Sequence, residues 1–104
     1  MTPRQILQKL EKFGFTPPQA RLYLCGLQLG PVLMKPLAQT AQVSRSTAYY
    51  LMAELERRNF FTSRKVGKRV YYQAALPAKL LAMTQDRERL ITDLLPTLQT
   101  ITRS

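Results

Sequence analysis

The sequence has no histidine and no tryptophan, and it has a single cysteine. One cysteine excludes a disulfide within the chain, and without histidine the usual ligand sets for zinc are missing. The six carboxylates are scattered and no glycine-rich phosphate loop is present, so no nucleophile is paired with a base. We therefore expect no enzymatic activity, no metal and no cofactor, and we interpret Cys25 as a small core residue on a helix.

Long apolar runs and acidic residues are also scarce. No stretch approaches the roughly 20 apolar residues that span a bilayer, and the N-terminus lacks the apolar region of a signal peptide, so we expect a cytoplasmic protein with no membrane partner. The 16 Lys and Arg residues outnumber the 6 Asp and Glu residues, which gives a formal net charge of +10. This excess favours a polyanionic partner, most commonly a nucleic acid, with an acidic membrane surface as the alternative.

The chain has the length and apolar content of one domain, with 104 residues of which 45% are hydrophobic. Two helices of the same design are predicted at its start. Each begins with a capping residue, Thr2 or Thr16, which is followed by Pro and by Gln at the third helical position. The first helix should end near Gly14 and the second at Gly30.

A third, short helix is predicted over Lys35 to Gln42, and a fourth over Ser44 to Arg58 with Ser44 as its capping residue. The fourth helix has an inward face of apolar residues at helical spacing: Ala48, Leu51, Met52 and Leu55. Its outward face is left with Arg45, Ser46, Tyr49, Tyr50 and Ala53. At least one of the two tyrosines should therefore be exposed.

A hairpin is predicted after the fourth helix. Asn59 should end that helix, because Asn tolerates a positive φ better than most residues. Beyond it, the β-forming segments Phe60 to Val66 and Lys68 to Ala74 flank Gly67, a pattern typical of two paired strands. We expect one of the adjacent residues Tyr71 and Tyr72 to enter the core and the other to face outward.

From Pro77 the pattern predicts a helix of about 25 residues, roughly 37 Å long, which exceeds what a core of this size can cover. The portion from Leu80 to Met83 should pack on its own domain. The distal part has apolar residues at 3-4-3 spacing, which suits pairing with a second copy of the chain: Ile91, Leu94, Leu98 and Ile101. Pro96 should kink this helix or begin a new one.

These elements indicate a DNA-binding protein. The exposed first turns of the fourth helix carry basic, hydroxyl and aromatic side chains, and six basic residues with no acidic one lie from Arg57 to Arg69. The predicted class is mainly α with a small β-hairpin wing, a winged helix-turn-helix followed by a long helix. We divide the chain into a DNA-binding domain over residues 1–76 and a dimerisation helix over residues 77–104.

Several segments carry a family pattern: Phe15-Thr16-Pro17 with Ala20 to Leu24, Leu37-Ala38, Val43 to Tyr49, Leu55 to Arg58, and Gly67 to Tyr72. Together they resemble the winged helix-turn-helix domain of TrmB-family transcriptional regulators over nearly the whole chain, although the MarR and ArsR groups share much of the pattern. Gln42 departs from this pattern, because the family usually has Gly at that position. If the turn requires a positive φ there, a residue other than Gly costs about 1 kcal/mol of stability. The sugar-binding domain that often follows in such regulators has no counterpart in the 104 residues, so effector sensing is not carried over from the resemblance and the question of a small-molecule effector stays open.

The resemblance implies that the Ser44 to Arg58 helix lies in the major groove with its N-terminal end toward the bases. Arg45 is the first candidate for a base contact, because its planar fork can pair with both acceptors of guanine. Phosphate and thymine-methyl contacts would be divided among other residues of this helix: Ser44, Ser46, Thr47, Tyr49 and Tyr50. Further DNA contacts are expected from Lys35 and, as phosphate neutralisation by the wing, from Arg64, Lys65, Lys68 and Arg69.

Each of these residues has a plainer interpretation. Arg45 can be a solvated surface residue, the exposed tyrosines can serve a protein interface, and the wing charges can serve solubility. The leading hypothesis is a homodimeric, sequence-specific regulator that binds double-stranded DNA at the nucleoid. The alternative is an accessory module of transcription or chromatin machinery that binds protein and has only nonspecific affinity for nucleic acid. A regulator should prefer its own site over random duplex by about 10³-fold or more.

Overall fold

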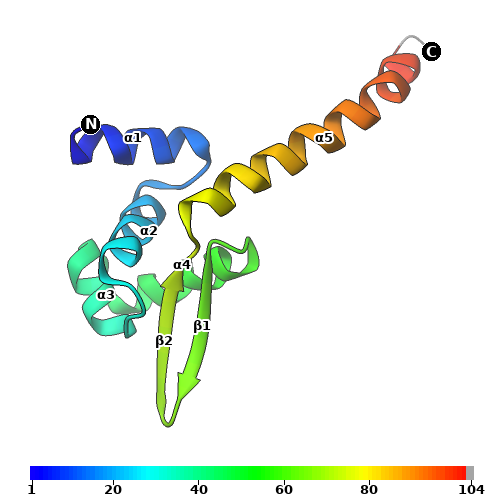
Figure 1. Ribbon diagram of the computed structural model, residues 1–104. Helices are drawn as coiled ribbons and strands as arrows, with labels where there is room; N and C mark the ends of the chain where they lie inside the picture. The colour runs from blue at the N-terminus through cyan, green and yellow to red at the C-terminus, as the bar shows by residue number, and fades with distance from the viewer. Residues whose placement is uncertain (103–104) are drawn as a thin grey trace.

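The computed structural model describes residues 1–102, which form five helices and one two-stranded antiparallel sheet (Figure 1). In chain order the elements are α1 Pro3–Phe13, α2 Pro17–Leu29, α3 Met34–Ala41, α4 Arg45–Arg57, β1 Phe61–Val66, β2 Arg69–Ala74 and α5 Pro77–Thr102. The predicted class is confirmed, and each predicted element is present within a few residues of its expected bounds.

The first two helices begin with the predicted caps. The Thr2 hydroxyl accepts the Gln5 N–H at 3.2 Å, and the Gln5 side-chain carbonyl accepts the Thr2 N–H at 2.9 Å. Thr16 and Gln19 exchange the same two bonds at the start of α2. Each pair satisfies two backbone donors that a helix start otherwise leaves free, which fixes where these helices begin.

The turn between α3 and α4 is left-handed at Gln42, where φ is 57° and ψ is 45°. Its N–H donates to the carbonyls of Ala38 and Gln39, which closes α3. The Arg21 guanidinium of α2 donates to the Ala41 carbonyl at 3.0 Å and ties this turn to the preceding helix. The expected cost of a non-glycine residue is therefore real at Gln42. Asn59, with φ 65°, ends α4 as predicted.

Aromatic rings join the helices to the sheet. Phe15 stacks on Tyr23 with 5.3 Å between ring centroids and lies 4.7 Å from Phe60. The Tyr23 hydroxyl donates to the Ala75 carbonyl at 2.8 Å, and burial raises the pKa of this phenol. Gly26 lets α2 approach β1 closely, because a Cβ added there would lie 2.7 Å from the Phe61 ring. The contacts of α2 therefore join the other helices to the sheet.

The hairpin turns at Gly67, where φ is +61°. Val66 pairs with Arg69, so the connection between the strands is the two residues Gly67 and Lys68, for which positive φ at the first position is required. The sequence did not reveal a third partner of the sheet. Val32, between α2 and α3, exchanges two backbone hydrogen bonds with Tyr72, at 3.0 and 2.7 Å, and so pins the base of β2 to the helices.

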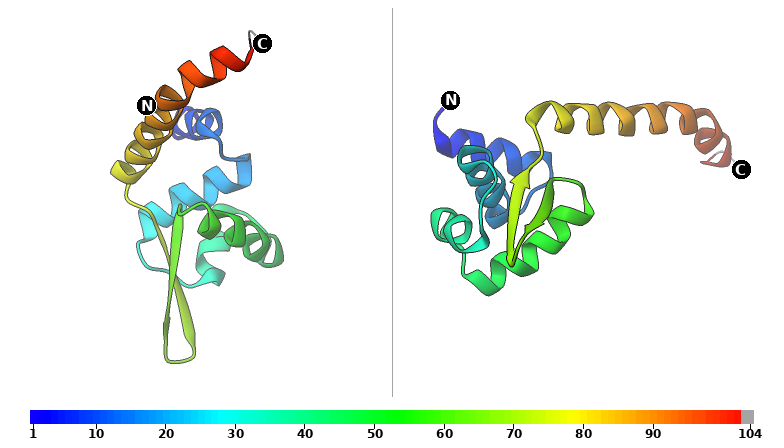
Figure 2. Two further views of the ribbon diagram at one scale, coloured as in Figure 1. Left: turned by 90° about the vertical axis from the view of Figure 1, so that its right-hand side faces the viewer. Right: turned by 60° about the horizontal axis from the view of Figure 1, so that its bottom comes forward.

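The last helix leaves the domain soon after it begins (Figure 2). Leu80 and Met83 pack against the core, as predicted, whereas every residue from Thr84 to Thr102 is exposed. Pro96 does not begin a new helix: α5 continues through it, and the ribbon changes direction in its last turns (Figure 2). Within residues 1–102 no helix is both long and apolar enough to cross a membrane.

Candidate nucleic-acid interface

The outward face of α4 carries the predicted residues. The Ser44 hydroxyl accepts the Thr47 N–H at 3.3 Å and donates to the Thr47 hydroxyl at 2.8 Å, so these two side chains are joined in the helix cap. Ala48, Met52 and Leu55 are buried on the opposite face. The exposed residues of the first two turns are Arg45, Ser46, Thr47, Tyr49 and Tyr50. Both tyrosines are exposed, Tyr49 by 46% and Tyr50 by 79%.

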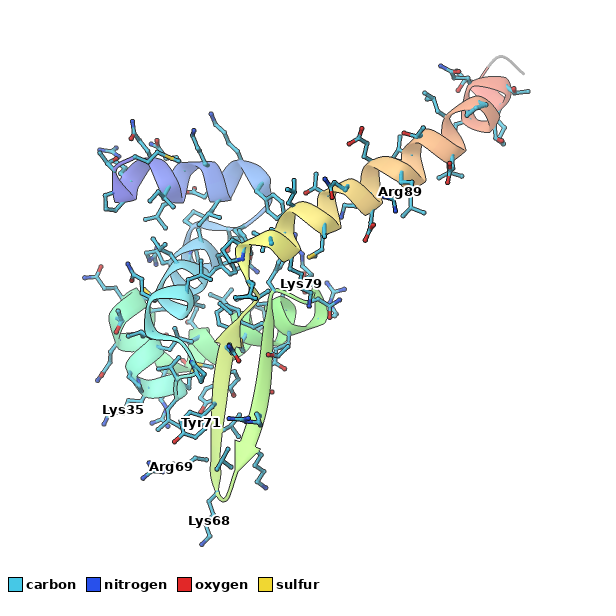
Figure 3. The ribbon with its side chains drawn as sticks, viewed as in Figure 1. Lys35, Lys68, Arg69, Tyr71, Lys79 and Arg89 are labelled. Atoms are coloured by element: carbon cyan, nitrogen blue, oxygen red, sulfur yellow. The ribbon has the colours of Figure 1, made fainter. Side chains whose placement is uncertain are left out.

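A groove of about 450 Å³ lies between the start of α3, the start of α4 and the wing. Its lining combines cations from all three elements with an apolar and aromatic floor: Leu33, Met34, Lys35, Arg45, Tyr49, Lys68, Arg69, Val70 and Tyr72. Figure 3 shows Lys35, Lys68 and Arg69 at the end of the molecule that carries the hairpin tip, away from α1. Residues that are 34 positions apart in the sequence, Lys35 and Arg69, therefore serve one surface.

The electrostatics of this groove favour an anionic ligand. None of its lining residues is acidic, and four of them are Lys or Arg. Burial raises the pKa of Tyr72, and the nearby Tyr49 and Glu56 add to the shift, so the phenol on the floor stays protonated at neutral pH. The groove thus offers positive charge together with neutral hydrogen-bonding groups, a combination suited to phosphates and base edges.

The two cations in the middle of β1, Arg64 and Lys65, lie on opposite faces of the hairpin. In a strand, neighbouring side chains point to opposite faces. Arg64 pairs with Tyr71, and these two residues line a separate hollow of about 300 Å³ on one face of the hairpin. Lys65 pairs with Val70, whose side lies toward the groove. Tyr72 is buried, as expected for one of the two tyrosines, whereas Tyr71 on the other face is half-buried and not fully outward.

Two of the six basic residues from 57 to 69 have partners within the fold. The Arg57 guanidinium pairs with the Glu54 carboxylate at 2.7 Å, and this pair lowers the pKa of Glu54. The Arg58 guanidinium lies 4.8 Å from the centroid of the Phe60 ring and donates to the Gly14 carbonyl at 3.3 Å. Tyr50 lines a hollow beside these residues, on a different side of α4 from Tyr49. Fewer of the six basic residues are therefore free to bind an anionic ligand than the sequence indicated.

Sequence reasoning missed the floor of the groove. Leu33 and Met34 precede or open α3, and Val70 and Tyr72 alternate along β2. Because side chains of a strand alternate between its two faces, the sequence of β2 was sufficient to predict that Val70 and Tyr72 share a face. Nothing local in the sequence placed Met34 beside them, because that approach depends on the backbone pairing of Val32 with Tyr72.

A family model described as "Sugar-specific transcriptional regulator TrmB" matches residues 10–78. That range contains α2, α3, α4, the whole hairpin and every residue that lines the groove. The comparison with curated proteins returned no match.

Solved structures of similar fold include several regulators. TrmBL2, an archaeal chromatin protein whose structure "shows a novel mode of DNA binding", superimposes with a TM-score of 0.84 at 20% identity over 99% of this chain. The chain spans 40% of the length of TrmBL2. A MarR family transcriptional regulator from Silicibacter pomeroyi gives 0.61 at 18% identity, covering 96% of this chain and 83% of that one. MepR from Staphylococcus aureus, a regulator of a multidrug efflux pump, gives 0.55 at 20% identity, covering 94% and 88%.

Proposed function

This chain belongs to the TrmB family of transcriptional regulators, and from that premise we propose that it binds double-stranded DNA sequence-specifically as a homodimer. In this proposal α4 enters the major groove with its N-terminal end toward the bases, and the wing lies along the sugar-phosphate backbone. The observation that carries the proposal is the acid-free groove in which Lys35, Arg45, Lys68 and Arg69 meet from three elements.

The residues have distinct roles in this arrangement. Arg45, at the first turn of α4 and without an intramolecular ion pair among the described residues, reads a guanine edge through two parallel hydrogen bonds. Lys68 and Arg69, at the hairpin tip, neutralise phosphates and carry no sequence information. Tyr49 also lines the groove and offers a ring to a thymine methyl or a hydroxyl to a phosphate.

The second copy is needed to cover α5. Its predicted seam residues, Ile91, Leu94, Leu98 and Ile101, are between 44% and 63% exposed in the single chain. Pairing two such seams would bury them and would set two copies of α4 about 34 Å apart, one helical turn of DNA. The dimer should therefore prefer a pseudo-palindromic site.

A second candidate is a chromatin-type role with little sequence preference. It is favoured by the high structural similarity to TrmBL2, which is described as a chromatin protein. The two candidates differ in the ratio of affinities for the preferred and for random duplex, about 10³ or more for a regulator and near unity for a chromatin protein. Binding-site selection with the purified protein, followed by titration of the selected and a scrambled duplex, measures this ratio directly.

The division of roles is tested by three variants at fixed salt concentration. Arg45→Ala should weaken binding to the selected site by about 1–3 kcal/mol and change scrambled duplex little. The double variant Lys68→Gln with Arg69→Gln should weaken both duplexes alike. Lys9→Gln with Lys12→Gln, which removes the same charge from α1 at the far end of the domain, is the control and should change either affinity much less (Figure 1). Equal losses for the wing variant and the α1 control would contradict the assigned interface.

A further inference from the structure

The distal part of α5 has no support from its own domain. All residues from Thr84 to Thr102 are exposed, and the helix stands away from the rest of the molecule (Figure 2). Tertiary packing supplies most helical stability in proteins, and these residues receive none of it from their own domain. Six of its large apolar residues lie exposed along it: Leu90, Ile91, Leu94, Leu95, Leu98 and Ile101. Some other surface must cover them.

The width of this apolar face is greater than two helices need. Successive residues of a helix are about 100° apart, so the six side chains occupy an arc of about 140°. A two-stranded coiled coil uses a narrower seam of a and d positions, which Ile91, Leu94, Leu98 and Ile101 supply. Leu90 and Leu95 then lie at the two edges of the arc, where a single partner helix leaves them in water. A helix with such an arc is suited to two neighbours in a bundle.

Area and charge favour further copies of the same chain as these neighbours. The six residues are between 44% and 63% exposed. They present on the order of 600 Å² per helix, whereas a stable interface usually buries about 800 Å² on each partner, so a single shared seam is small. The charges of α5 within residues 77–102 balance, with Lys79, Arg87 and Arg89 against Asp86, Glu88 and Asp93. Copies of α5 can therefore approach without the repulsion that the basic domain would impose.

The proline inside α5 also fits a bundle. Pro96 lies about 170° from the centre of the apolar arc on the same wheel, so its missing N–H affects the carbonyl on the water side. Arg87 lies within the arc one turn before Leu90, and it separates the part that packs on the chain's own core from the apolar face. The domain is thus held apart from the bundle by a polar stretch over residues 84–89.

We propose that four copies of α5 form a four-helix bundle that joins two DNA-binding dimers, so that the tetramer bridges two DNA duplexes. The proposal rests on the proposed function for its DNA contacts. The hairpin tip and the C-terminal end of α5 lie at opposite ends of the molecule (Figure 1), so the DNA-binding groove faces away from the bundle. Within the tetramer, Ile91, Leu94, Leu98 and Ile101 hold each dimer, and Leu90 and Leu95 hold the dimers together.

The test compares three double variants of the full chain by sedimentation velocity and by a bridging assay, in which an immobilised duplex captures a second, labelled duplex. Leu90→Gln with Leu95→Gln should yield a dimer that keeps its affinity for one duplex but captures the second at least about tenfold less well. Leu94→Glu with Leu98→Glu should yield a folded monomer with weak binding. Leu76→Gln with Leu81→Gln is the control, because these leucines are also exposed, by 71% and 61%, but lie outside the arc, and it should remain a tetramer.

A wild-type protein that sediments as a dimer at bridging concentrations, or a Leu90→Gln with Leu95→Gln variant that stays tetrameric, would overturn the bundle. These sedimentation results do not depend on DNA. A tetramer that binds no duplex would instead contradict the proposed function, and with it the bridging, but not the bundle. The failure of the bundle and the failure of the proposed function are therefore distinguishable.

Discussion

The cations of this chain differ in what their side chains contact. Arg58 and Arg45 are both basic residues of the α4 region, but Arg58 lies against the Phe60 ring and the Gly14 carbonyl, whereas Arg45 lines the open groove. The amino-acid pattern could locate the cluster but could not separate these roles. The partners of Arg58 are Gly14, which follows α1, and Phe60, which precedes β1; they lie 44 and 2 residues away, and only the folded chain brings them together. Exposure therefore selects the candidate DNA contacts better than residue type.

Gln42 has a backbone conformation that is unfavourable for a residue with a Cβ atom. Its φ of 57° is more favourable for glycine, so Gln42→Gly should raise the free energy of unfolding by roughly 0.5–1 kcal/mol. Urea denaturation followed by circular dichroism measures this change. Gln39→Gly, at an exposed position inside α3, is the matched control and should lower stability by a similar amount. A loss of stability in Gln42→Gly would mean that the Gln42 side chain makes a contribution larger than the strain.

At the scale of elements, the sequence predicted what local chemistry decides. The Thr-Pro-x-Gln starts of α1 and α2, the Ser44 cap and the glycine turn of the hairpin each require only neighbouring residues. The Val32 pairing and the groove floor were missed, because they depend on two segments 40 residues apart. Strand alternation placed Arg64 and Lys65 on opposite faces in principle, but which face meets α3 and α4 follows from the burial of Tyr72.

Pro96 makes α5 a helix that can be strengthened. Proline has no backbone N–H, so it removes one hydrogen bond of the helix at a cost of about 3 kcal/mol relative to Ala. Because Pro96 is exposed, its replacement would lose no packing. Pro96→Ala should therefore increase helical circular dichroism and tighten self-association, which sedimentation equilibrium would measure. Thr97→Ala changes helix propensity by only a few tenths of a kcal/mol and is the control. Weaker association of Pro96→Ala would show that the bend itself shapes the interface.

For the whole molecule, charge is divided between two regions. Residues 1–76 carry 12 Lys and Arg against 3 Asp and Glu, whereas α5 is balanced. If a DNA-bound dimer neutralises about eight phosphates, log K should fall with log[salt] at a slope near −7, measurable by fluorescence anisotropy between 50 and 300 mM salt. The Lys68→Gln with Arg69→Gln variant should reduce the magnitude of this slope by up to about four units per dimer. A wild-type slope shallower than about −2 would contradict DNA binding through this surface.

The unsupported helix beyond Met83 would, under the proposed self-association, tie activity to the number of molecules in the cell. If residues 84–102 gain their packing from other copies, dilution would remove the partner that keeps them helical, and the DNA-binding domains would then act singly. Occupancy of a paired site would consequently rise with a power of protein concentration greater than one. A modest change in synthesis or degradation rate would then act as a threshold switch on the occupancy of that site.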